Sequence, residues 1–76
     1  MEDCRISIGK MAELNHVSIA TLRLYDEMNL LKPFYIDPET NYRYYRIEQN
    51  SRLDLIAYMK DLGMSLKEIQ KILAKE

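Results

Sequence analysis

The chain has 76 residues, 47% of them apolar and 30% charged, and its formal net charge at pH 7 is −1. This length predicts one small domain and leaves little room for a deep substrate cleft between subdomains. The composition argues against extensive disorder, and no apolar run approaches the ~20 residues that a membrane-spanning helix needs.

The amino terminus shows no sign of export or of a metal site. It opens with acidic residues and lacks the apolar segment of a secretory signal. The single cysteine, Cys4, cannot form an internal disulfide and has no cysteine or histidine at metal-ligand spacing. We therefore expect a cytoplasmic protein that needs no metal or other cofactor and has no membrane partner.

Two short helices are predicted in the first part of the chain, separated by a turn at 15–17. The first, over 8–14, follows Ser7 as a candidate N-cap, and the second, over 18–28, begins at Ser18 in the same role. Apolar residues recur at helical spacing along both: Ile8, Met11, Ala12, Ile19, Leu22 and Tyr25. This pattern predicts a helix-turn-helix, whose second helix can lie in the major groove of DNA, although many helical corners share the spacing without binding DNA.

The middle of the chain changes to residues that favour strands. Runs of aromatic and β-branched residues over 34–36 and 42–45 flank a turn cluster over 37–41. They predict a β-hairpin over 34–45. Since an isolated hairpin is only marginally stable in water, it must dock on the helices.

Two further helices complete the predicted fold, which is mostly α with one small hairpin. One spans about 47–62 and ends at Gly63, and the other begins at Ser65, which forms a capping box with Glu68. The apolar faces that we expect to point inward are Leu55, Ile56, Met59 and Leu62 in the first, and Leu66, Ile69, Ile72 and Leu73 in the second.

Nothing in the sequence resembles a catalytic constellation. The only histidine, His16, lies in a predicted turn without an orienting partner. Gly9 and Gly63 are too far apart in the chain to form a phosphate-binding loop, and the carboxylates are dispersed. We predict that the chain is not an enzyme.

Arginine and tyrosine residues gather on the second helix and the hairpin. Arginine neutralises phosphates or contacts guanine edges, and hydroxyl groups bond phosphate oxygens. The alternative is that the tyrosines are core residues. Alternation along the strand places Tyr42 and Tyr44 on one face, and Arg43 and Tyr45 on the other. One of these faces must pack inward, so we expect two or three of the six tyrosines to be structural.

Five segments of the chain stand out together, and they cover nearly all of it: Ile6–Ala12, Val17–Asp26, Leu30–Pro33, Asn41–Tyr45 and Leu62–Ile69. In this order they resemble the amino-terminal domain of the MerR family of transcriptional regulators, and the 37–45 stretch is similar to the multidrug-responsive branch. The resemblance implies a winged helix-turn-helix. The second helix would enter the major groove, the hairpin would form the first wing, and the last two helices would form the second wing.

The resemblance also implies which residues contact DNA. They are Ser18, Thr21, Arg23, Leu24 and Tyr25 on the second helix, Tyr42 and Arg43 on the first wing, and Lys60 and Ser65 on the second wing. Leu24 stands where many relatives have an aromatic residue. Asn41 stands where glycine is common, and asparagine also tolerates a left-handed backbone. The near-neutral net charge argues mildly against DNA binding. A domain of this charge can still bind DNA if its basic residues lie together. We therefore expect one face to carry Arg23, Arg43 and Lys60, and the acidic residues Glu48, Asp54, Asp61 and Glu76 to lie elsewhere.

The function that follows from the resemblance is sequence-specific binding to double-stranded promoter DNA. Family members act as homodimers that distort a promoter in response to an effector and so affect RNA polymerase indirectly. We expect residues 1–76 to be one such DNA-binding domain, without the dimerisation helix and the effector domain, and to dimerise weakly or not at all by itself. Two alternatives remain: an excisionase-like architectural factor that bends DNA, and a small protein-interaction module whose tyrosine-rich hairpin docks on a partner.

Overall fold

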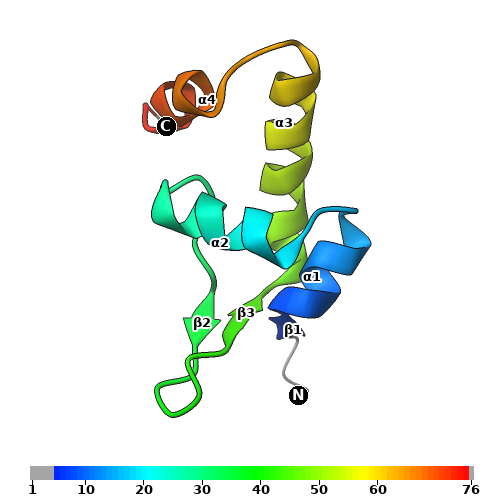
Figure 1. The fold of residues 1–76 in the computed structure, drawn as a ribbon, viewed down its shortest axis with the longest axis vertical. Coiled ribbons are helices and arrows are strands. Elements are labelled where there is room, and N and C mark those ends of the chain that lie inside the picture. Colours follow the sequence, from blue (N-terminus) through cyan, green and yellow to red (C-terminus); the bar gives the residue numbers. More distant parts are fainter. Residues whose placement is uncertain (1–4, 76) are drawn as a thin grey trace.

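Helices α1 and α2 form the predicted helix-turn-helix (Figure 1). The structure is a computed structural model and describes residues 5–75. Helix α1 spans Ile8–Leu14 and α2 spans Ile19–Glu27. The side-chain oxygens of Ser7 and Ser18 each accept a hydrogen bond from the backbone N–H three residues further on, as N-caps do. The structure thus confirms both predicted caps and places each end of both helices within one residue of the prediction.

A small antiparallel sheet contains the predicted hairpin and one further strand. Its order is β1-β3-β2, with β1 at Ile6–Ser7, β2 at Tyr35–Ile36 and β3 at Arg43–Tyr45. Strand β1 pairs with β3, with Ile6 opposite Tyr45. A strand of two residues is too short to show an alternating pattern, which is why β1 was not predicted. Since β1 leads directly into α1, it ties the hairpin to the helix-turn-helix.

The second half of the described chain holds two helices at an angle to each other (Figure 1). A 3₁₀ turn over Ile47–Gln49 precedes α3 at Asn50–Asp61, so the helix predicted over 47–62 is divided in two. Gly63, with φ 93°, follows α3 in the left-handed region that favours glycine. Helix α4 spans Leu66–Leu73 and begins with the predicted capping box at Ser65.

The inward faces of α3 and α4 differ from the predicted ones. Leu55 and Leu62 are 42% and 64% exposed, and Ile72 is 48% exposed. The side chains of α3 that reach the core are Leu53, Ile56 and Met59, and those of α4 are Ile69 and Leu73. Helix α3 carries apolar residues at helical spacing on two of its sides. Periodicity alone therefore does not show which side packs inward.

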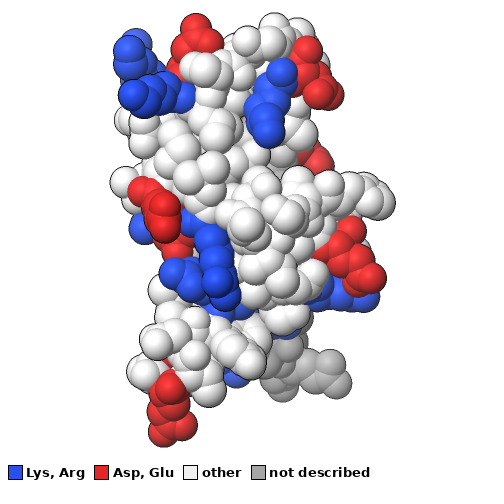
Figure 2. Space-filling model, viewed as in Figure 1, with Lys and Arg blue, Asp and Glu red and all other residues white. Residues whose placement is uncertain are grey.

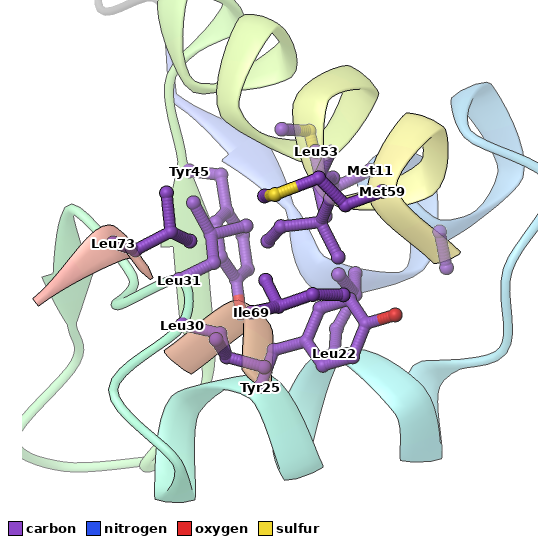
Figure 3. Packing of buried hydrophobic residues seen from close by; sticks show 12 residues of the cluster. Met11, Leu22, Tyr25, Leu30, Leu31, Tyr45, Leu53, Met59, Ile69 and Leu73 are labelled. Carbon is purple, nitrogen blue, oxygen red and sulfur yellow. The ribbon is translucent and has the colours of Figure 1, made fainter. Parts of the chain in front are cut away.

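The core lies where all four helices meet strand β3 (Figure 3). Its buried members are Met11, Ala12, Leu22, Tyr25, Leu30, Leu31, Tyr45, Leu53, Ile56, Met59, Ile69 and Leu73. Tyr45 is fully buried and docks the sheet on the helices, and Ile6 of β1 packs against the same core. With Tyr25 also buried, at least two of the six tyrosines are structural, as predicted.

The segment between α2 and β2 is held by side chains from the second half of the chain. Three backbone carbonyl oxygens accept hydrogen bonds there. Gln49 Nε2 donates to Lys32 at 2.7 Å. Arg52 Nε donates to Leu30 at 2.6 Å, and Gln70 Nε2 donates to the Met28 carbonyl at 2.7 Å. The position of the hairpin relative to α2 is therefore fixed by side chains of α3, α4 and the turn before α3.

The described residues extend over 37 × 23 × 21 Å. The sheet lies at one end of the long axis, the turn between α3 and α4 lies at the other, and α2 lies between them (Figure 1). Both predicted wings thus flank the second helix of the helix-turn-helix. No helix in residues 5–75 is long and apolar enough to cross a membrane.

Candidate nucleic-acid interface

Two hydroxyl groups are paired at the start of α2. Ser18 Oγ lies 2.8 Å from Thr21 Oγ1, and it also accepts a hydrogen bond of 3.0 Å from the Thr21 backbone N–H. Ser18 is exposed and Thr21 is half-buried. The cap and the hydroxyl pair hold both side chains in place, so the helix presents two ordered hydroxyl groups at its amino-terminal end.

The next residues of α2 point in different directions. Arg23 is exposed, and Leu24 is 41% exposed. Tyr25 is only 3% exposed and packs in the core (Figure 3). Because its ring is buried, we assign Tyr25 to the core rather than to the DNA contacts that the family resemblance implied.

A groove separates α2 from the hairpin. Its volume is about 290 Å³, and its walls include Arg23 on α2 and both Tyr42 and Arg43 from the hairpin. Tyr42 is 66% exposed and is accessible to a ligand. Asn41, next to it, adopts the left-handed backbone that was expected there, with φ 63°. Helix α2 and the hairpin therefore face the same side of the molecule.

Arg43 is held by a carboxylate of α2. Its Nε donates to Asp26 Oδ2 at 2.9 Å, while Lys32 Nζ donates to Asp26 Oδ1 at 2.8 Å. Burial of Asp26 favours the neutral acid, but the hydrogen bonds and charges of Lys32 and Arg43 outweigh that effect. They hold the pKa of Asp26 below its ordinary value of 3.8. One carboxylate between two cations leaves this cluster with a net positive charge.

The two expected contact residues of the second wing lie apart from that groove. Lys60, near the end of α3, lines a separate hollow together with Asp54 and Asp61. The prediction that Lys60 lies away from these two acids is therefore wrong. Ser65 is exposed and caps α4. On the face shown in Figure 2, basic and acidic groups alternate instead of forming one basic stripe.

Aromatic rings and arginines pack together at the base of the hairpin. The guanidinium of Arg5 lies 4.7 Å from the ring centre of Tyr35 and 5.3 Å from that of Tyr44. Arg46 lies 3.8 Å above the ring of Phe34. Cation–π contacts of this kind stiffen the short hairpin. They leave Tyr42 as the tyrosine of the hairpin that is exposed to the greatest extent.

Asp26 and Lys32 also belong to this site and were not predicted from the sequence. A signal was available, because Asp26 is one residue after Tyr25 and four after Leu22, which places a carboxylate on the inward face of α2. Such a carboxylate needs cationic partners. Within residues 5–75, no three His, Cys, Asp or Glu side chains are arranged to hold a metal ion. Cys4 and Glu76 lie outside the described residues.

The arrangement of a helix-turn-helix with a flanking hairpin agrees with a family comparison. Residues 6–76 match the model of the MerR HTH family regulatory proteins. The chain belongs to the MerR family. The fold prediction of a winged helix-turn-helix is thereby confirmed, and the family consists of regulatory proteins rather than enzymes.

Individual MerR proteins are similar to the chain over most of its length. The multidrug-efflux transporter 1 regulator of Bacillus subtilis (strain 168) is 46% identical over 71 residues, which are 93% of this chain and 26% of that protein. The structure of EcmrR in its DNA complex within EcmrR-RPo has a TM-score of 0.81 and 36% identity, and the match covers 84% of this chain and 24% of EcmrR.

A second structure similar to the chain also contains DNA. HiNmlR, a MerR family regulator lacking the sensor domain, bound to promoter DNA, has a TM-score of 0.78 and 32% identity. That match covers 90% of this chain and 53% of HiNmlR. The chain thus spans about a quarter of the length of the multidrug-efflux regulator and about half of HiNmlR.

Proposed function

We propose that the chain binds double-stranded promoter DNA as the DNA-binding domain of a transcriptional regulator. The observation that carries this proposal is the groove shared by Arg23 and Arg43, since it places α2 and the hairpin on one side of the molecule. A helix that enters the major groove and a wing that follows the phosphate backbone need this arrangement. Membership of the MerR family and the DNA in two similar structures support it.

The residues of the interface take different roles. Thr21, Arg23 and Leu24 are close to the start of α2 and would face base edges, and Ser18 would bond a phosphate. Tyr42 and Arg43 would hold the backbone beside the major groove. On the second wing, Ser65 would approach a phosphate, and Lys60 would contribute less than an isolated lysine because Asp54 and Asp61 lie in the same hollow.

The wider activity of the regulator is part of the same proposal. A longer protein containing this domain would bind a two-fold symmetric promoter site as a homodimer in the cytoplasm and distort it in response to an effector. That distortion would activate transcription by realigning the elements that RNA polymerase reads. Distorting a promoter costs a few kcal/mol, which wing contacts at both flanks can offset. The chain by itself would need no cofactor and would dimerise weakly or not at all.

A selection experiment tests the proposal. Duplexes retained by the chain from a random-sequence pool are sequenced, and the enriched duplex is titrated against a permuted duplex of the same composition. We expect the enriched duplex to bind at least about 10-fold more tightly, and both affinities to fall steeply with added salt. If no duplex is retarded even at low salt, the proposal fails and the protein-interaction alternative gains. Light scattering of the chain measures its oligomeric state.

A further inference from the structure

We propose that Asp26 is a positioning residue for DNA binding, which holds the guanidinium of Arg43 in the orientation that a phosphate requires. The inference rests on the proposed function. Asp26 itself would not touch DNA, since its side chain is only 10% exposed. It would act through Arg43, whose side chain is 30% exposed and lines the groove next to α2.

The geometry of the pair leaves part of Arg43 available. Asp26 Oδ2 accepts the hydrogen bond from Arg43 Nε at 2.9 Å. A guanidinium group has five N–H donors in one plane, and four of them are on its two terminal nitrogens. Fixing Nε fixes that plane, so the terminal nitrogens are oriented before any phosphate arrives. A phosphate then binds without the full loss of side-chain freedom that a mobile arginine would suffer.

The carboxylate is itself held in place on both sides. Lys32 Nζ donates to Asp26 Oδ1 at 2.8 Å and to the Asp26 backbone carbonyl at 3.1 Å. The backbone carbonyl of Lys32 accepts a hydrogen bond of 2.7 Å from Gln49. The side chain of Asp26 on α2 thus bonds both the hairpin, through Arg43, and the segment after α2, through Lys32. Because both cations remain, the cluster still attracts a phosphate.

Replacing Asp26 by asparagine gives opposite results under two explanations. If only net charge matters, D26N removes a negative charge close to the DNA and binding becomes tighter. If Asp26 positions Arg43, D26N weakens binding to every duplex, by about 5- to 10-fold, because the orientation of one phosphate contact is lost. The slope of log Kd against log salt should also decrease by ~0.9, which is the contribution of one phosphate contact.

The matched control is E27Q. Glu27 is the next residue on α2, is exposed, and carries the same charge as Asp26. Removing its charge should leave the affinity unchanged or raise it, with the salt slope preserved. The fraction of folded D26N is measured by circular dichroism. A purely structural defect lowers the concentration of active protein but does not alter the salt slope.

A double-mutant cycle on the enriched duplex tests whether Asp26 acts through Arg43. In an R43A background, D26N should cause no further loss of affinity. The variant R43K gives a second test that keeps Asp26. Lysine retains the charge but not the planar fork, so we expect R43K to lose nearly as much affinity as R43A.

Several results would overturn the inference. The first is that D26N binds DNA as tightly as the unaltered chain or more tightly. The second is that D26N lowers the affinity equally with and without Arg43. The third is that R43K binds as tightly as the unaltered chain. Each of these results counts only when the unaltered chain binds its enriched duplex more tightly than the permuted one. If the unaltered chain shows no such preference, the proposed function itself fails, so the two failures are distinguishable.

Discussion

Arg23 of α2 and Arg43 of β3 line one groove, but their surroundings differ. Arg43 is bonded to a buried carboxylate, whereas Arg23 is exposed and makes no ion pair within the described part of the chain. A fixed arginine suits a repeating backbone, and a mobile one can adapt to a base edge. This difference predicts that the two side chains contribute to DNA binding in separable ways.

Replacing Arg23 by alanine should relax the preference for particular bases. The loss of one base contact weakens binding to the enriched duplex by ~1–3 kcal/mol, while binding to a permuted duplex changes far less. Fluorescence anisotropy on duplexes with each base pair changed in turn locates the affected position. An equal loss on all duplexes would show that Arg23 contacts only the backbone.

Replacing Arg43 by alanine should weaken binding to all duplexes by about the same factor. Because a phosphate contact disappears, the salt slope falls by about 0.9. Titrations at four or more salt concentrations measure this slope. Arg46, which packs on Phe34 at the base of the hairpin, provides a matched control, since R46A removes the same charge outside the groove. If R46A and R43A have identical effects, net charge alone explains the loss.

The local elements of this fold could be predicted from the sequence because their signals are local. Ser7, Ser18 and Ser65 cap helices through contacts three residues away, and Gly63 provides the left-handed residue after α3. Strand β1 could not be predicted, since two residues form a strand only when β3 is already beside them. The sequence of so short a segment does not indicate its pairing with a distant strand.

The candidate site was predictable in part for the same reason. The resemblance to MerR proteins implied contacts at the start of α2 and on the hairpin, and Arg23, Tyr42 and Arg43 line one groove. The surroundings of two other residues could not be predicted, because they depend on how helices rotate in the packed molecule. Tyr25 is buried in the core, and Lys60 lines one hollow with Asp54 and Asp61. The same packing brought Asp26 against Arg43, a contact between residues distant in the chain.

Asp26 should make the stability of the domain sensitive to acid. Its pKa is lower in the folded protein than its ordinary value of 3.8, so its contribution is fully present above that pH. The contribution is lost as the pH falls through the lower folded pKa, because the unfolded chain binds the proton more readily. At pH 7 the free energy of unfolding of D26N should be about 1–2 kcal/mol lower than that of the unaltered chain. This difference should shrink below pH 3.8. Urea unfolding of both proteins at pH 7 and below pH 3.8 tests this prediction, and a difference that does not change with pH would contradict it.

The cap of α4 should be separable from any contact that Ser65 makes with DNA. Ser65 Oγ accepts from the Glu68 backbone N–H at 3.2 Å, and Glu68 returns a hydrogen bond of 2.8 Å. S65A should therefore cost ~1 kcal/mol of stability. S65D keeps a capping oxygen but places a negative charge where a phosphate would approach. We expect S65D to retain stability while it weakens DNA binding, and tight DNA binding by S65D would remove Ser65 from the interface.

Replacing Tyr45 by phenylalanine should stabilise the domain. Its hydroxyl is buried and finds no hydrogen-bond partner among residues 5–75, so its desolvation is not compensated. Y45F keeps the ring in the core and should raise the free energy of unfolding by ~1 kcal/mol at pH 7. Burial raises the pKa of Tyr45, and the charge of Asp26 adds to this while Arg43 opposes it.

The raised pKa of Tyr45 predicts a second effect of Y45F in alkaline solution. Above pH 10.0 the tyrosine of the unfolded chain loses its proton before that of the folded protein, so the unaltered domain loses stability as the pH rises. Y45F removes this contribution, and its advantage should increase above that pH. The matched control is Y58F on α3, where the side chain is 61% exposed and loss of the hydroxyl should leave the stability at pH 7 unchanged. If Y45F is less stable than the unaltered chain at pH 7 and Y58F is not, the hydroxyl of Tyr45 has a partner that contributes to the fold.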